Sequence, residues 1–198
     1  MAKVITFSRQ FPKDHPRSGE PTYFVEQVLN ALGIDWNNNL EYQRLLYRLN
    51  PTLTDQVLIP FWHNLRYGTI YNDSNQWENR KPHTIRSGNR WKAGDKFSPR
   101  VWSGTPYNSP QIIFAPEVEL KQVIPIKIAK TAGNEVLTVV GRYYASVGPA
   151  NSEIITSGSI FPTLAKNDGL ALQDFLDWFK YPKPFQGQIL AWREVGYV

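Results

Sequence analysis

An alternation of apolar residues between residues 118 and 128 constrains the fold of this chain more than any other stretch of its sequence. The even positions hold Val118, Leu120, Ile124, Ile126 and Ile128, with Gln122 as the one polar member. Successive side chains of a β-strand point to opposite faces, so the pattern predicts one long strand with one buried face. The dipeptide Gly133-Asn134 is typical of a turn, and the segment VLTVVGRYY after it (residues 136–144) predicts a partner strand.

The chain before Tyr71 has mainly helical patterns. Residues 4–7 form a short apolar run that predicts a strand, and a long proline-rich loop follows it. A helix is expected over residues 21–33, because this segment opens on proline and closes on glycine. A second helix is expected over residues 40–50, directly before a proline. The segment 57–68 is apolar but interrupted by proline, so its structure stays open at this point.

Extended segments dominate after Gly68. Residues 84–86 and 96–102 predict two strands, and residues 187–195 predict a final one. A late amphipathic helix is expected from the helical spacing of Leu172, Phe175, Leu176 and Phe179, with Asn167 and Asp168 as capping candidates. The predicted fold class is α+β: helices first, then a mostly antiparallel sheet or small β-barrel with one late helix.

Composition narrows the class of protein. Hydrophobic residues make up 41% of the 198 residues and charged residues 20%, as in a globular protein. The chain has no cysteine, which excludes disulfides, thiolate catalysis and zinc–thiolate sites. It has neither an apolar run of about 20 residues nor a signal-peptide core. We therefore expect a cytoplasmic protein without membrane association.

Positive charge is concentrated between residues 79 and 100. This window holds Arg80, Lys81, Arg86, Arg90, Lys92, Lys96 and Arg100 against the single acid Asp95, so it carries +6 while the whole chain carries +5. Trp91, Trp102 and Tyr107 are interleaved with the window or follow it. Cations beside aromatic rings can hold a base or nucleotide, which predicts RNA or a nucleoside as partner. The alternative is a solvated basic edge whose tryptophans point into the core.

The segment Lys81-Pro82-His83-Thr84 has the form of a four-residue turn with proline at its second position. Such a turn would bring an amine and a hydroxyl together, a nucleophile–base pair related to those of acyl transfer. A lysine at a turn and a threonine in a strand are also ordinary, so the spacing alone leaves both interpretations open. The histidines show no metal-ligand spacing and there is no phosphate-binding glycine loop, so neither a metal nor a cofactor is expected.

Several short motifs together resemble a known family. They are Lys81-Pro82-His83-Thr84-Ile85-Arg86, then Trp91, Gly94 and Asp95, and later Asn167-Asp168-Gly169-Leu170. In order and chemistry they resemble the ASCH domain, a PUA-like β-barrel. The resemblance implies an ASCH/PUA-like domain over residues 71–198, with residues 1–70 as an N-terminal helical extension packed on the barrel. Asn79 departs from the glycine that the family often has, and residues 102–122 exceed the minimal barrel.

The small bacterial ASCH proteins that this chain resembles are amidohydrolases that remove the acetyl group from N(4)-acetylcytidine. The resemblance implies that Thr84 is the nucleophile, Lys81 the base and Asp168 an assisting acid. The residues expected to bind the substrate are Arg80, His83, Arg86, Trp91, Trp102 and Tyr107. Other family members bind RNA without catalysis or are ribonucleases. The alternatives are therefore a reader of RNA or of a modified base, and a metal-independent ribonuclease using Lys81 and His83 on the phosphate.

Overall fold

The computed structural model describes residues 3–70, 75–130, 136–140, 143–147, 160–179 and 184–197. Its contacts divide the chain into two compact units, both discontinuous in sequence. Unit 1 contains Met1–Lys81 and Asp95–Glu119, and unit 2 contains Pro82–Gly94 and Leu120–Val198. The division differs from the expected boundary near Ile70, because the segment Asp95–Glu119 belongs with the segment Met1–Lys81.

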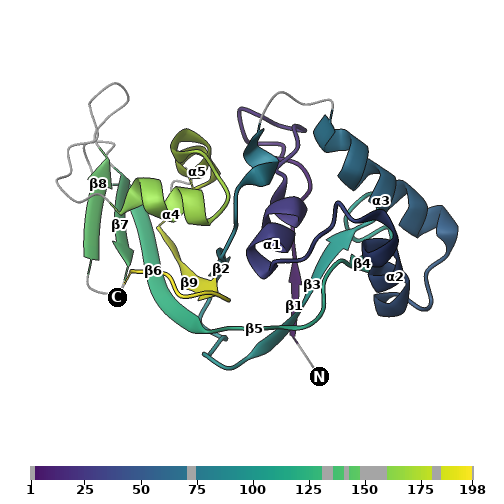
Figure 1. Ribbon diagram of the computed structural model, residues 1–198. Helices are drawn as coiled ribbons and strands as arrows, with labels where there is room; N and C mark the ends of the chain where they lie inside the picture. Colours follow the sequence, from purple (N-terminus) through teal and green to yellow (C-terminus); the bar gives the residue numbers. More distant parts are fainter. Residues whose placement is uncertain are drawn as a thin grey trace. The chain divides into compact units, whose positions relative to one another are not determined.

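Unit 1 combines helices with a four-stranded sheet (Figure 1). Its elements are β1 (Lys3–Thr6), α1 (Phe24–Leu32), α2 (Asn39–Leu49), α3 (Asp55–Ile70), a short 3-10 helix (Asn75–Glu78), β3 (Lys96–Trp102), β4 (Gln111–Ile113) and β5 (Val118–Glu119). Strand β3 is the centre of the sheet: β1 pairs with it in parallel, and β4 and β5 pair with it antiparallel. The strand at the start of the chain is therefore part of a sheet built largely from residues 96–119.

The helices of unit 1 follow the sequence signals with two differences. Helix α1 begins at Phe24 instead of Pro21, because Pro21 forms a β-bridge with Gln10 and Tyr23 is left-handed at φ 57°. It ends as expected at Gly33, which is left-handed at φ 73°. The apolar segment whose structure was left open is helical throughout as α3, although Pro60 lies inside it. Its buried side chains Leu58, Phe61 and Leu65 lie at helical spacing, so packing on this face offsets the missing hydrogen bond.

Unit 2 contains a five-stranded antiparallel sheet accompanied by two helices (Figure 1). Its elements are β2 (His83–Ser87), β6 (Gln122–Lys130), β7 (Val136–Val140), β8 (Tyr143–Val147), α4 (Phe161–Asn167), α5 (Leu172–Trp178) and β9 (Phe185–Ala191). The strand order is β2-β9-β6-β7-β8, so the last strand of the chain lies beside the first strand of this sheet. Among the described strands, β2 is therefore at an edge.

The predicted α+β class is confirmed, but the described strands form two open sheets and not one closed barrel. The predicted strand over residues 118–128 is wrong in its continuity: β5 belongs to the sheet of unit 1 and β6 to that of unit 2. Its predicted buried face is confirmed, since all five apolar members are buried. The predicted partner strand over residues 136–144 consists of β7 and the start of β8. The expected turn at Gly133-Asn134 lies outside the described residues.

The late helical region also differs from the prediction. Two helices occur there, and α5 has Ala171 at its N-cap. Asn167 and Asp168 instead close α4, where the Asp168 N–H donates to the Leu164 carbonyl and Gly169 is left-handed at φ 81°. None of the described helices combines the length and the hydropathy that crossing a bilayer requires.

Candidate functional site

A buried polar cluster in unit 2 surrounds His83, the first residue of β2. The imidazole is 0% exposed, and its Nε2 lies 3.0 Å from the Tyr197 hydroxyl. On the other side of the ring, Nδ1 lies 3.6 Å from Oδ1 of Asp168. The Asn167 amide donates to the Tyr197 hydroxyl at 2.6 Å. An acid, an imidazole and a phenol thus form a row, although they come from three separate segments of the chain.

The contacts around Tyr197 determine the favoured proton positions. Because the Tyr197 oxygen accepts from Asn167, its own hydrogen is available to His83 Nε2 at 3.0 Å or to the Thr163 carbonyl at 3.4 Å. Donation to Nε2 is the shorter bond and leaves the imidazole hydrogen on Nδ1, the nitrogen that faces Asp168. Burial raises the pKa of the Tyr197 phenol, which the Asn167 hydrogen bond lowers and Asp168 raises. The phenol therefore remains a neutral donor at physiological pH.

Sheet pairing and a helix end bring these residues together. His83 pairs in register with Ala191 of β9, and the next residue, Trp192, donates its N–H to the Pro82 carbonyl. Asp168 sits where α4 ends in a left-handed glycine. His83 and Thr84 already belong to a strand, because the ladder to β9 needs an extended backbone there. The predicted four-residue turn over residues 81–84 is therefore wrong.

Asp168 also interacts electrostatically with Arg86 of β2. Burial lowers the pKa of the Arg86 guanidinium, the Asp168 carboxylate raises it and Arg90 lowers it. Asp168 thus interacts with side chains at two positions of one strand, His83 and Arg86.

Thr84 lies between these two residues on β2 and pairs with Leu190. By strand alternation its side chain shares a face with Arg86 and is opposite to that of His83. Thr84 is only 5% exposed, so its hydroxyl is not the exposed group that a turn position implies.

Lys81 belongs to unit 1. Its backbone N–H donates to the Gln27 carbonyl at 3.0 Å, and its ammonium lies 4.2 Å from the centre of the Phe24 ring. The residue is 1% exposed, so this lysine is an interior side chain and not a surface cation. The predicted nucleophile–base pair combines Lys81 of unit 1 with Thr84 of unit 2, and it stays a prediction.

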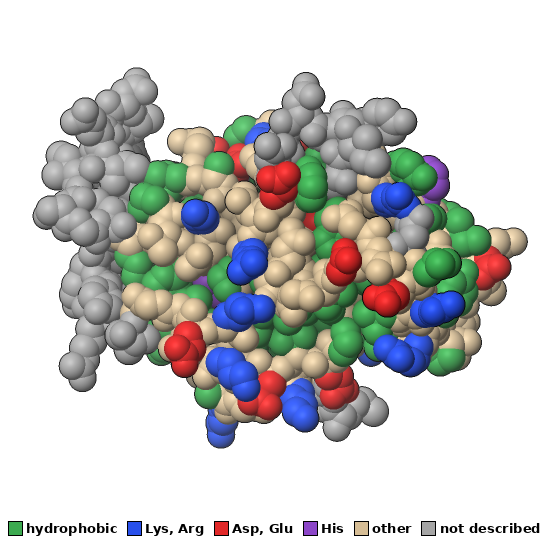
Figure 2. All heavy atoms as spheres, in the orientation of Figure 1, with side chains coloured by type: hydrophobic (Ala, Val, Ile, Leu, Met, Phe, Trp, Pro, Cys, Tyr) green, Lys and Arg blue, Asp and Glu red, His purple; other side chains and the backbone are tan. Residues whose placement is uncertain are grey.

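The seven basic residues between residues 79 and 100 differ in their exposure to solvent and do not form one charged surface. Arg80, Arg90, Lys92 and Lys96 are exposed, whereas Lys81 is buried and Arg86 and Arg100 are half-buried. The chain also alternates between the two units within this window. Elsewhere charge signs are mixed: Figure 2 shows basic and acidic side chains side by side over α2 and α3 of unit 1.

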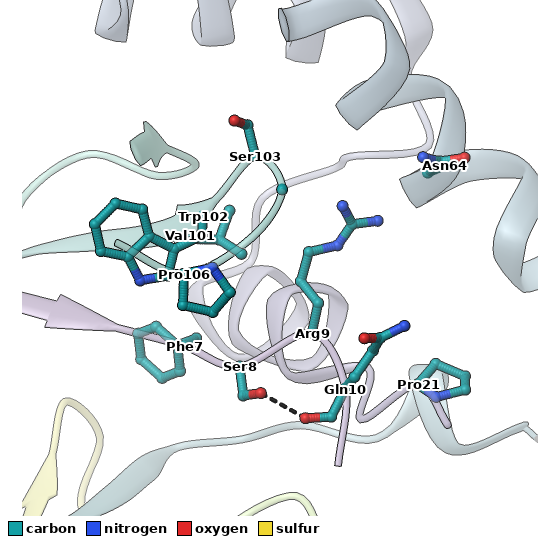
Figure 3. A pocket seen from close by; sticks show the side chains of 11 residues that line it. Phe7, Ser8, Arg9, Gln10, Pro21, Asn64, Val101, Trp102, Ser103 and Pro106 are labelled. Atoms are coloured by element: carbon teal, nitrogen blue, oxygen red, sulfur yellow. Dashed lines mark hydrogen bonds between the residues drawn. The ribbon is translucent and has the colours of Figure 1, made fainter. Parts of the chain in front are cut away.

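Two of the aromatic residues expected to bind substrate lie in unit 1. The Trp102 and Tyr107 ring centres are 5.3 Å apart, and Tyr107 is 88% exposed. Trp102 also lines a cavity of about 450 Å³ into which Arg9 projects (Figure 3). Arg9 was not among the predicted site residues, and its only sequence signal was its place in the long proline-rich loop.

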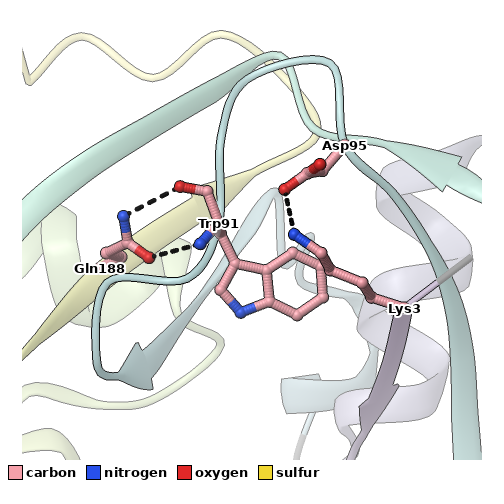
Figure 4. Close-up of polar contacts among 4 residues, drawn as sticks. All are labelled: Lys3, Trp91, Asp95 and Gln188. Carbon is pink, nitrogen blue, oxygen red and sulfur yellow. Dashed lines mark hydrogen bonds and ion pairs between the residues drawn. The ribbon is translucent and has the colours of Figure 1, made fainter.

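Trp91 is buried and forms a structural contact, and its expected stacking role stays a prediction. It is 3% exposed, and its backbone exchanges two hydrogen bonds of 3.1 Å with the side-chain amide of Gln188 (Figure 4). These bonds attach the loop after β2 to β9 within unit 2. Asp95, the one acid of the basic window, forms a 2.6 Å ion pair with Lys3 of β1 within unit 1 (Figure 4).

Sequence reasoning missed Tyr197 and the role of Asn167. Tyr197 belongs to none of the motifs, and Asn167 was expected as a helix cap and as part of the family motif, without a contact to Tyr197. Among the described residues, no group of three histidine, aspartate or glutamate side chains is arranged to hold a metal ion. Comparisons with protein-family models, with curated proteins and with solved structures each find no match to this chain.

Proposed function

We propose that the protein is an amidohydrolase that removes an acyl group from N(4)-acylated cytosine nucleosides, with Thr84 as nucleophile. The observation that carries the proposal is the position of Asp168 within unit 2. This acid is distant from Thr84 in sequence, yet it contacts His83 and interacts with Arg86, which lie on either side of Thr84 along β2. A buried acid that interacts with a guanidinium of the strand that also carries the Thr84 hydroxyl is a combination that acyl transfer can use.

In the proposed reaction the Thr84 oxygen forms a bond to the acyl carbon, and Lys81 takes the hydroxyl proton. The negative charge that develops on the acyl oxygen is stabilised by Arg86 or by backbone N–H donors. The bond between the acyl carbon and N(4) then breaks, and the nitrogen receives a proton from Lys81 or through Asp168. Water hydrolyses the resulting ester, which releases the carboxylic acid and regenerates Thr84.

The row formed by Asp168, His83 and Tyr197 would fix the orientation of the acid. His83 presents Nδ1–H to the carboxylate, and Tyr197 holds the opposite nitrogen. His83 acts through Asp168 and is a positioning residue in this proposal. Its complete burial disfavours the ribonuclease alternative, which requires this imidazole to reach a phosphate.

The direct test is incubation with N(4)-acetylcytidine and detection of cytidine and acetate. Thr84→Val is the appropriate variant, since it removes the hydroxyl and keeps the branched shape of a nearly buried strand residue. We expect it to abolish turnover. Ser87→Ala is the matched control, because it removes an exposed hydroxyl from the same strand and should leave the rate unchanged. Full activity of Thr84→Val, or no cytidine from the unmodified protein, would contradict the proposal.

A further inference from the structure

The cavity around Arg9 in unit 1 has the size of a small-molecule site. Its volume of about 450 Å³ lies within the roughly 300–1,000 Å³ typical of ligand pockets. Its walls come from the segment after β1, from α3 and from the loop after β3. Figure 3 shows the guanidinium of Arg9 extending into the space between Ser103 and Asn64. The other lining side chains are apolar or uncharged and polar, so Arg9 is the one ionised group among the residues that line this cavity.

The backbone that carries Arg9 is held on two sides. The Phe7 N–H donates to the Arg100 carbonyl, and the Arg9 carbonyl accepts from the Thr22 N–H at 3.0 Å. The Thr22 hydroxyl also donates to the Ser8 carbonyl at 2.7 Å. The guanidinium carbon lies 5.7 Å from the centre of the Phe61 ring. Arg9 is thus directed into the cavity by a fixed backbone and an aromatic neighbour, and it does not extend freely into solvent.

The opposite wall consists of the end of β3, which carries the Trp102 ring, and the loop after it, which carries the Tyr107 ring. The Gly104 N–H donates to the Ser109 hydroxyl, which itself donates to the Thr105 carbonyl at 2.9 Å. Tyr107 adopts a left-handed backbone at φ 65°, a conformation that costs energy for a non-glycine residue. This backbone holds an exposed ring against Trp102 next to Pro106 of the cavity wall. An aromatic pair of one exposed and one half-buried ring at the edge of a cavity is a suitable platform for a flat ring.

A second cavity of about 240 Å³ shares Arg9 and Asn64 with the first and is also lined by Glu26. Burial raises the pKa of the Glu26 carboxyl from its ordinary value of 4.5 to about 7, against the lowering effects of its own backbone hydrogen bond and of Arg9. Near neutral pH this acid therefore carries only part of its charge. Glu26 therefore compensates the positive charge of Arg9 only in part.

We infer that the Arg9 cavity binds a nucleoside 5′-monophosphate, with the phosphate on Arg9 and the base against the Trp102–Tyr107 pair. A guanidinium with hydroxyl and amide groups around it fits an anion with several oxygens. The aromatic pair provides a second contact, to the base of the nucleotide. Inorganic phosphate has no base and cannot form this contact. This inference concerns unit 1 alone and does not depend on the reaction proposed for unit 2.

Isothermal titration of the full chain with cytidine and adenosine 5′-monophosphates tests the inference. We expect saturable binding that Arg9→Ala weakens roughly 10- to 100-fold, as for the loss of a charged hydrogen bond. Tyr107→Ala changes an exposed residue and should weaken binding several-fold without altering the fold. Arg17→Ala is the matched control: this arginine lies in the same loop and pairs with Glu20 away from the cavity, so its loss should not change the affinity.

Three further ligands sharpen the test. Cytidine and inorganic phosphate should each bind at least tenfold more weakly than the monophosphate, because each provides only one of the two contacts. A 5′-phosphorylated trinucleotide distinguishes a free nucleotide from the end of a nucleic-acid strand, and either source agrees with the inference. Absence of binding at millimolar monophosphate would overturn it, as would equal affinity of folded Arg9→Ala. If Arg9→Ala does not fold, unchanged affinity of Tyr107→Ala overturns it instead.

Discussion

Buried or half-buried ionisable side chains occur in both units, and their neighbours give them different properties. His83, Asp168 and Tyr197 in unit 2 face one another at distances from 3.0 to 3.6 Å. Glu26 in unit 1 instead loses hydration without an equal compensation, and its pKa rises to about 7. The polar groups of the row in unit 2 stabilise one arrangement of their three side chains. An acid with a raised pKa, such as Glu26, instead makes the free energy of unfolding depend on pH.

The sign of the Glu26 effect follows from proton binding. Between pH 4.5 and about 7 the folded protein binds more protons at this residue than the unfolded chain, so the free energy of unfolding falls as the pH rises. Glu26→Gln has no carboxyl group to ionise at this position, so this decrease in the free energy of unfolding is absent from the variant. We expect its stability relative to the unmodified protein to be higher at pH 8 than at pH 4.5, by roughly 3 kcal/mol at most. Chemical denaturation at both pH values measures the difference.

The exposed Glu41 of α2 offers a matched control for this measurement. Glu41→Gln changes the net charge of the chain by the same amount. It should show no comparable pH dependence relative to the unmodified protein. An equal effect of both substitutions would assign the pH dependence to net charge and not to the burial of Glu26.

The role of Lys81 can be tested separately from that of Thr84. Arginine stays protonated at any working pH, so Lys81→Arg preserves a cation but cannot accept a proton. If Lys81 is the base, Lys81→Arg and Lys81→Ala should both lower kcat for N(4)-acetylcytidine by roughly 10²–10⁴-fold. Substantial activity of Lys81→Arg beside an inactive Lys81→Ala would instead indicate a purely electrostatic role. Because the side chain is almost fully buried, each variant is first compared with the unmodified protein by thermal unfolding.

At the scale of elements, the β2–β9 pair determines the geometry of the candidate site. His83, Thr84 and Arg86 all pair with β9 in register. The pair includes one position where a side chain cannot be accommodated. A Cβ atom added at Gly187 would lie 2.2 Å from the Arg86 carbonyl oxygen and 2.8 Å from the Phe185 ring. Glycine at this position allows the two strands to approach each other closely.

Gly187→Ala should therefore displace β2 and lower the free energy of unfolding, by about 1–3 kcal/mol, as for other overpacked positions. It should also lower the amidohydrolase rate, because Thr84 and Arg86 move with the strand. Gly196→Ala is the matched control, since a Cβ atom at that glycine would meet no atom within 4 Å. Denaturant unfolding of both variants measures the effect. Equal stability of the two would show that the strands can separate there without cost.

At the scale of the whole molecule, the chain passes between its two units three times, and neither unit is a continuous segment. Strand β1, at the start of the chain, pairs with β3, which begins only at Lys96. The segment before Tyr71 is therefore part of the sheet and core of unit 1. Contacts of such large sequence separation cannot form within a short fragment.

A fragment of residues 71–198 should accordingly fail to fold in its unit 1 part. It would contain β3, β4 and β5 without β1 and without the helices that accompany this sheet. We expect limited proteolysis of the intact protein to release no stable, active fragment that begins near Tyr71. Mass spectrometry of the products, with an assay of each, is the measurement. A stable and active fragment of this kind would show that the N-terminal segment is an independent attachment.

The sequence alone determined the local features: the C-terminal ends of α1 and α2, the approximate positions of β1, β2 and β3, and the buried face of residues 118–128. Each depends on neighbouring residues, through proline, glycine or side-chain periodicity. The tertiary structure decided which sheet each strand joins, because a strand's periodicity does not specify its partner. For that reason one apolar alternation became β5 and β6 in two different sheets. Likewise only the fold could bring Asp168 and Tyr197 to His83, since contacts between segments so far apart in sequence leave no local pattern.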